Sequence, residues 1–125
     1  MMILSSIVPL FLAVNLFGAV PEKAVPLKRE QIERQLVGPV LKWRLLGFPE
    51  NRIGDRQYDK DGSFWWKRLD AEYSGTGSWR LDGDAFCEKY DPAQSWKGRD
   101  WVCQPVVMHD GVAFFGNTFV WQPEE

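Results

Sequence analysis

Beyond residue 40, apolar and polar residues alternate with a period of two, which is the pattern of a half-buried β-strand. Leu41, Trp43 and Leu45 would share one face of the first such strand, with polar residues on the other. Similar short runs recur along the chain, separated by Gly, Asp, Asn and Pro residues that favour turns. The strands expected from this pattern are 40–45, 56–58, 63–70, 79–81, 85–90, 101–108 and 112–121, the last with a candidate break at Gly116-Asn117.

A helical pattern precedes these strands, between Pro26 and Val37. Ile32 and Leu36 are four residues apart on a short apolar face, and opposite charges recur at the same spacing on the other side. Pro26 suits the first turn of a helix, where its missing N–H is not needed. Gly38 and the proline after it would end the helix. One helix of about ten residues is therefore expected.

The turns between the strands contain short Asp-Gly sequences, which favour tight hairpins. Short strands joined by such turns predict an antiparallel meander rather than a parallel sheet. A sheet of this size must cover its apolar face with itself or with the helix. The sequence thus predicts a mainly β fold, in which the meander forms a curled sheet or small barrel and the short N-terminal helix packs at one end or face. Residues 25–125 would form this single domain.

The N-terminal segment is uncharged from Ile3 to Val20 and is rich in Ile, Leu, Val, Phe and Ala. This composition is typical of a secretory signal, and we assign residues 1–24 to it. An uncleaved N-terminal anchor is the alternative, since the run approaches the length that spans a bilayer. In that case membrane contact would be made through this segment only. Both interpretations predict a periplasmic or secreted domain.

Two cysteines, Cys87 and Cys103, lie within the expected domain. An even number of cysteines in a small exported chain indicates a disulfide. Closing a loop of this length would stabilise the fold by about 3 kcal/mol. Metal binding would require more Cys or His ligands than the chain's single histidine provides, and redox pairs usually have a C-x-x-C spacing. We therefore expect a structural disulfide and no metal site.

Composition limits the possible partners. The net charge is −2 and no basic stripe is present, so nucleic-acid binding is not expected. The chain is rich in aromatic residues, with Trp 7, Phe 8 and Tyr 3. Most of these rings can serve as core of a small domain, but some could line a ligand site. The candidates for such an aromatic patch are Trp65, Trp66, Trp96 and Trp101.

The motifs occur in a characteristic order: Tyr58-x-x-Asp61-Gly62, Gly77-x-Trp79, Gly83-Asp84-x-x-Cys87, then a second cysteine and a closing strand. In this order the chain resembles a family of small secreted bacterial β-meander proteins of unknown function with a two-cysteine pair. The resemblance spans about residues 30–121. It implies architecture, through turn glycines, a core tryptophan and a disulfide, and implies almost nothing about activity.

Residues capable of catalysis are few. His109 stands in a His-Asp-Gly turn, where a solvated polar residue is the simpler interpretation. The aspartate pairs of the turns at 59–61 and 82–84 could in principle cleave glycosides, but Asp is also favoured there by local hydrogen bonds. Asp55, Asp59 and Asp61 lack the spacing and closing Glu of a calcium loop. We therefore expect no catalytic residue, no metal and no cofactor.

These observations favour an exported, non-enzymatic domain of the cell envelope. Its partner would be a glycan, a lipid or a protein, bound through an aromatic patch. An inhibitor or other partner of a periplasmic enzyme is an alternative, in which the loop from Asp91 to Asp100 would enter the enzyme's cleft. An enzyme with an unrecognised site is the third possibility.

Overall fold

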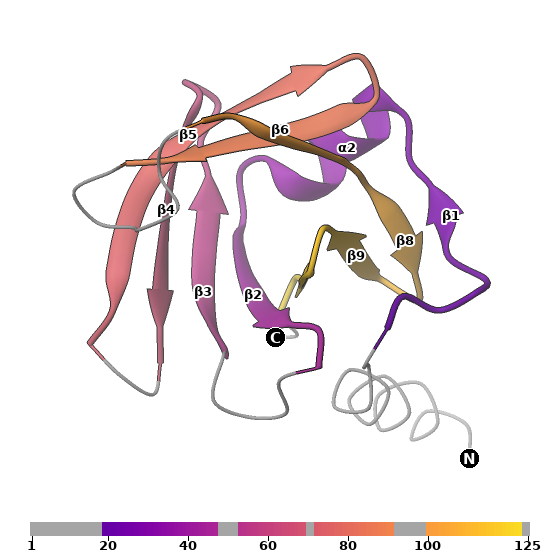
Figure 1. Ribbon diagram of the computed structural model, residues 1–125, viewed down its shortest axis with the longest axis horizontal. Helices are drawn as coiled ribbons and strands as arrows, with labels where there is room; N and C mark the ends of the chain where they lie inside the picture. Colours follow the sequence, from indigo (N-terminus) through magenta and orange to yellow (C-terminus); the bar gives the residue numbers. More distant parts are fainter. Residues whose placement is uncertain (1–18, 48–52, 70–71, 92–99, 124–125) are drawn as a thin grey trace.

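The structure, a computed structural model, describes residues 19–47, 53–69, 72–91 and 100–123. These residues form one helix and ten strands, and the ten strands pair in a single antiparallel sheet (Figure 1). The mainly β prediction is therefore confirmed. The elements in chain order are β1 (Val25–Pro26), α2 (Arg29–Leu36), β2 (Val40–Leu45), β3 (Ile53–Tyr58), β4 (Ser63–Arg68), β5 (Ser74–Asp82), β6 (Ala85–Tyr90), β7 (Val102–Pro105), β8 (Val107–His109), β9 (Val112–Phe115) and β10 (Thr118–Trp121).

The strand order in the sheet is β1-β8-β9-β10-β2-β3-β4-β5-β6-β7. From β2 to β7 each strand pairs with the next, as in a simple meander, and β10 returns to pair with β2. In the chain, Val106 alone separates β7, at one end of the sheet, from β8, near the other end. The chain thus passes directly from one end of the strand order to the other, and the sheet has to curl to bring these two ends together (Figure 1).

The helix is shorter than the pattern predicted. Pro26 is not in its first turn but in β1, opposite Val107 of β8, and the Leu27 N–H donates to the Val106 carbonyl at 2.8 Å. These contacts hold the chain extended up to Leu27, so that α2 begins only at Arg29. This is a tertiary effect, because the partner strand is far away in the sequence.

The helix packs on the inner side of the curled sheet. Its N-terminal turn is completed from a distant hairpin, because the Arg29 N–H donates to Asp84 Oδ1 at 2.9 Å. Such a bond satisfies one of the N–H groups that a helix start leaves unpaired. Ile32 and Leu36 are buried in the main core. The other members of this core are Leu41, Trp43, Tyr58, Phe64, Phe86, Val106, Ala113, Phe115 and Val120.

Several strands differ from their predicted bounds: β3 begins at Ile53 rather than at Arg56, and two further differences have identifiable reasons. The glycine-rich run before Trp79, predicted as a connection, is part of β5. Bare backbone is needed there: a Cβ on Gly75 would lie 2.6 Å from Trp66 Nε1, and one on Gly77 would lie 2.6 Å from the Phe64 ring. The stretch 101–108, predicted as one strand, is divided between β7 and β8 at Val106, whose side chain is buried. The break at Gly116-Asn117, by contrast, occurs as anticipated.

The disulfide is confirmed. Cys87 of β6 and Cys103 of β7 stand directly opposite each other, with their Cα atoms 3.9 Å apart and their sulfurs bonded at 2.04 Å. The bond links β7, the end strand of the sheet, to the strand beside it.

Candidate functional site

The tryptophans predicted to form a patch are placed separately. Trp66 points to the inner side, where its ring meets Trp43 edge-on at 6.3 Å between centroids. Trp65, the next residue of β4, points to the opposite face of the sheet. The Arg80 guanidinium lies over the ring of Trp101, 4.2 Å from its centroid. Trp96 lies outside the described residues.

Three aspartates that were considered for catalysis or calcium binding, Asp55, Asp61 and Asp84, make structural contacts instead. Asp61 accepts hydrogen bonds from the hydroxyl and the backbone N–H of Ser63, at 2.6 and 2.9 Å. These bonds stabilise the carboxylate and lower the pKa of Asp61 below its ordinary value. Asp84 caps the helix, and Asp55 pairs with Lys42 at 2.9 Å. His109 contacts the neighbouring Asp110, at 3.3 Å between Nε2 and Oδ2.

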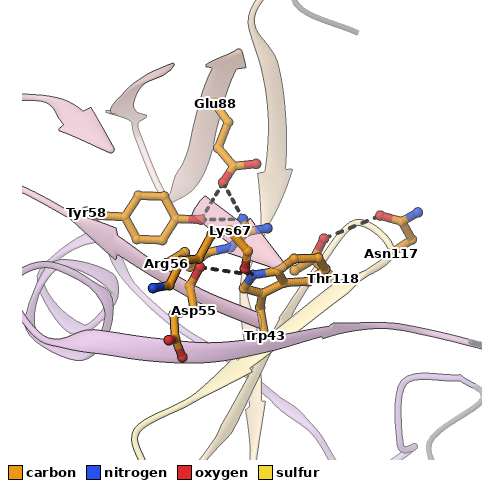
Figure 2. Close-up of polar contacts among 8 residues, drawn as sticks. All are labelled: Trp43, Asp55, Arg56, Tyr58, Lys67, Glu88, Asn117 and Thr118. Carbon is orange, nitrogen blue, oxygen red and sulfur yellow. Dashed lines mark hydrogen bonds and ion pairs between the residues drawn. The ribbon is translucent and has the colours of Figure 1, made fainter. Parts of the chain in front are cut away.

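A different group of residues forms the main polar feature of the inner side. Arg56, Tyr58, Glu88 and Tyr90, named here the buried polar cluster, come from β3 and β6. Arg56 Nη1 donates to the Tyr58 hydroxyl at 2.9 Å and lies 3.2 Å from Glu88 Oε2. The Tyr58 hydroxyl in turn donates to the same carboxylate oxygen. Figure 2 shows the resulting triangle of contacts.

Arg56 is held between this triangle and an indole ring. Its guanidinium lies 5.0 Å from the centroid of Trp43, a distance at which a cation is attracted to an aromatic face. The Trp43 ring is itself fixed, because its N–H is shared between the carbonyls of Asp55 and Lys67, at 3.1 and 3.2 Å (Figure 2). Gly54 permits this close packing, since a Cβ there would collide with the Lys67 carbonyl.

The electrostatics of the cluster follow from burial and from its one full ion pair. Burial by itself would lower the pKa of Arg56, but the attraction of Tyr58, Tyr90 and Glu88 outweighs it and holds that pKa above its ordinary value. Arg56 therefore stays charged. Burial is also the main reason why the pKa of Tyr58 is well above its ordinary value and that of Tyr90 is raised, with the negative charge of Glu88 adding to both shifts.

The tyrosines give a prediction for alkaline pH. A raised pKa in the folded state means that stability is unaffected below the unfolded tyrosine pKa of about 10 and is lost as pH rises above it, because only the unfolded chain then releases the proton. We expect the free energy of unfolding to fall above about pH 10, and to fall less steeply in Tyr58→Phe. Urea unfolding at a series of pH values measures this.

Tyr73→Phe is the matched control, because it removes a hydroxyl from an exposed ring. Equal slopes for Tyr58→Phe and the unchanged chain would contradict the assignment of the alkaline loss to the buried tyrosine.

On the side of Glu88 and Tyr90 the cluster borders a cavity of about 250 Å³. The cavity is partly enclosed and lies between β6, β7 and the β9–β10 turn. Its lining combines two carboxylates, two carboxamides and two hydroxyls with aromatic rings. The lining residues are Phe86, Glu88, Tyr90, Asp100, Val102, Gln104, Phe115, Gly116, Asn117 and Thr118.

Chemically, this cavity suits a small ligand that carries hydroxyl groups. The carboxamides of Gln104 and Asn117 can both donate and accept, and the carboxylates accept. Tyr90, which is partly exposed, offers flat apolar surface beside these groups, whereas Phe86 and Phe115 line the cavity but are at most 5% exposed. A larger hollow of about 360 Å³ beside α2 is lined mainly by charged side chains, among them Glu30, Glu33 and Lys60, and includes no aromatic ring. The cavity beside Glu88 is therefore the stronger candidate.

Sequence reasoning missed this site, although one signal for it was present. Phe86, Glu88 and Tyr90 alternate along β6 and so share a face, which places a carboxylate between two aromatic residues. A charged residue at an inward position of a strand needs a buried partner. The identity of that partner, Arg56 in β3, cannot be found from local pattern.

Comparison with protein-family models, with curated proteins and with solved structures finds no match for this chain. In the described ranges, no helix is long and apolar enough to cross a membrane. Those ranges also hold no group of three or more His, Cys, Asp or Glu side chains placed to bind a metal ion.

Proposed function

We propose that this chain is an exported, non-enzymatic domain of the cell envelope that binds a glycan in the cavity beside Glu88. The observation that carries the proposal is the lining of that cavity, where aromatic rings stand beside carboxamides and carboxylates. Such a mixture of apolar surface and a few fixed polar groups is characteristic of small-molecule sites. The aromatic contribution comes from Phe86, Tyr90 and Phe115 rather than from the tryptophans.

The polar lining favours a glycan over a lipid. The Asn117 oxygen already accepts from the Thr118 hydroxyl at 3.4 Å (Figure 2), but an acyl chain would bury the Gln104 carboxamide and the Asn117 side-chain NH₂ group without hydrogen-bond partners. Each buried unpaired polar group costs about 1–3 kcal/mol. Sugar hydroxyls can satisfy the same groups. A volume of about 250 Å³ is just below the usual range for ligand sites, which suits the terminal residue of a glycan.

The geometry of Glu88 favours binding over catalysis. Its carboxylate already accepts from Arg56 and Tyr58, so its charge is balanced and its position fixed. A general base needs to reach the proton it removes without giving up other hydrogen bonds. A carboxylate held in this way is better suited to accept hydrogen bonds from a ligand.

Two features support export. The uncharged N-terminal run has the composition of a secretory signal. The Cys87–Cys103 bond is of a kind that persists in the periplasm or outside the cell and is rare in reducing compartments.

Titration calorimetry of the oxidised chain with cell-wall fragments and soluble oligosaccharides tests the proposal. We expect a sugar to bind, and Asn117→Ala and Gln104→Ala each to weaken it about tenfold, the equivalent of one lost hydrogen bond. Gln122→Ala is the matched control, because it removes an exposed amide that does not line this cavity.

Other outcomes would contradict the proposal in recognisable ways. If Trp65→Ala or Trp101→Ala abolished binding while Asn117→Ala did not, the ligand would bind outside this cavity instead. Retention by lipid vesicles, or a stable one-to-one complex with a periplasmic enzyme, would replace the glycan by another partner. Turnover of the sugar would show an enzyme, and the absence of any sugar ligand would end the proposal.

A further inference from the structure

A second group of aromatic side chains lies outside the main core. Val112, Phe114 and Phe119 form a separate buried cluster, against which Trp121 packs. The rings follow one another across β9 and β10, with centroids 5.5 Å apart for Phe114 and Phe119 and 5.9 Å apart for Phe119 and Trp121. We call Val112 and these three aromatic residues the outer aromatic cluster.

Strand register places this cluster on the face opposite the main core. Ala113 and Val120 stand opposite each other in β9 and β10 and belong to the main core. Phe114 and Phe119 are also paired and alternate with them, so they point to the other side of the sheet. The same row extends from Pro26 and Val107 on one side to Arg44 and Ile53 on the other.

The burial of this face requires a covering layer. Val112, Phe114 and Phe119 are at most 1% exposed, and Arg44 beside them is 5% exposed. The partly buried side chains that pack on the cluster are Leu46, Val107 and Trp121, which belong to β10 or to strands of the same sheet beside β9 and β10, or directly follow such a strand. Neighbours within one sheet face shield each other sideways but not from above, so a second layer is needed. The helix α2 is not this layer, because Ile32 and Leu36 pack in the main core.

We propose that the N-terminal segment, residues 1–18, covers the outer aromatic cluster. Its residues are uncharged and mostly apolar, as this surface demands. The described chain begins at residue 19, shortly before β1, and Pro26 of β1 stands in the same row as Phe114 and Phe119. The other segments outside the described ranges are much shorter or, like 92–99, mainly polar.

The dimensions agree with this assignment. As a helix, 18 residues would extend about 27 Å at 1.5 Å per residue. The strands from β8 to β2 are four neighbours in the sheet and span roughly 15 Å at their usual spacing. The segment is thus long enough to cross the whole cluster. Its removal on export would expose Phe114, Phe119 and Trp121, so the precursor and the processed domain would present different surfaces.

Photo-cross-linking of the full chain tests the proposal. The chain is purified with its N-terminus intact, as checked by mass, with benzoylphenylalanine in place of Phe119. We expect the cross-linked peptide to come from residues 1–18 of the same molecule, and Leu12→Asp to abolish the cross-link. The matched control carries the photoreactive residue in place of Tyr73, which is 60% exposed and directly precedes β5.

Each alternative result overturns the assignment. A cross-link to a second copy, seen as a covalent dimer, would show that another molecule of this chain covers the cluster. A cross-link to added vesicles would show that the cluster contacts a membrane. Absence of any cross-link, or a cross-link to another segment, would exclude residues 1–18. Thermal unfolding provides an independent measure: Leu12→Asp and Phe119→Ala should lower the Tm by less in combination than the sum of their separate effects. Additive shifts would contradict direct contact. Because the cavity beside Glu88 lies on the inner side, neither result depends on glycan binding.

Discussion

Replacing Glu88 with alanine is expected to lower the free energy of unfolding by about 3–5 kcal/mol, the usual cost of breaking a buried ion pair. The variant would leave the Arg56 guanidinium buried, with its side chain 3% exposed, and without its carboxylate. The Tyr58 hydroxyl would also lose the oxygen to which it donates. Urea unfolding followed by circular dichroism measures the change.

Replacing the other partner of the ion pair, Arg56, should lower the free energy of unfolding by less. Arg56→Met leaves Glu88 without its cation, but Tyr58 still donates to the carboxylate. The Glu88 side chain is also 14% exposed and borders the cavity, so water can reach it. Methionine also keeps most of the apolar volume of the arginine stem. The two partners of one ion pair are therefore expected to differ in cost, and Arg56→Met combined with Glu88→Gln should be more stable than Glu88→Ala.

Lys42→Ala is the control for ion pairs in general. It breaks the pair with Asp55, in which both side chains are partly exposed, and should cost no more than about 1 kcal/mol. If Glu88→Ala cost as little as Lys42→Ala, burial would not make the Arg56–Glu88 pair more important to stability than an exposed ion pair.

Removal of the disulfide is expected to have the second largest effect. Cys87 and Cys103 are 16 positions apart, and closing a loop of this length stabilises a fold by about 3 kcal/mol. For a domain of this size the Tm should fall by roughly 12–24 °C. Thermal unfolding of the oxidised chain and of the variant with Cys87→Ala and Cys103→Ala measures the difference.

A reducing agent separates loss of the bond from loss of packing. Cys87 is fully buried, so its substitution also removes a sulfur atom from a packed position. Reduction of the unchanged chain should lower its Tm, whereas the double variant should not respond. An unchanged Tm on reduction would show that the bond adds nothing to stability.

The sequence by itself determined most of the strands and their antiparallel order. Alternation in β2 and β6 and the Asp-Gly turns are local signals, because neighbouring residues set both the face of a strand and the type of turn. The disulfide could also be predicted, since the N-terminal run predicts export and paired cysteines in a small exported domain usually form a disulfide. These features depend on residues that are close together in the chain or on composition alone.

Only the tertiary structure decided which side chains meet. Arg56 and Glu88 are 32 positions apart, and nothing near either residue shows that they form a buried pair. Pro26 is extended because β8 pairs with it, and the glycine-rich run joins β5 because rings from β4 need bare backbone beneath them. The cavity and the outer aromatic cluster arise in the same way, from strands brought together by the curl of the sheet. Local pattern fixes the face on which a side chain lies, but what it contacts there depends on strands distant in the sequence.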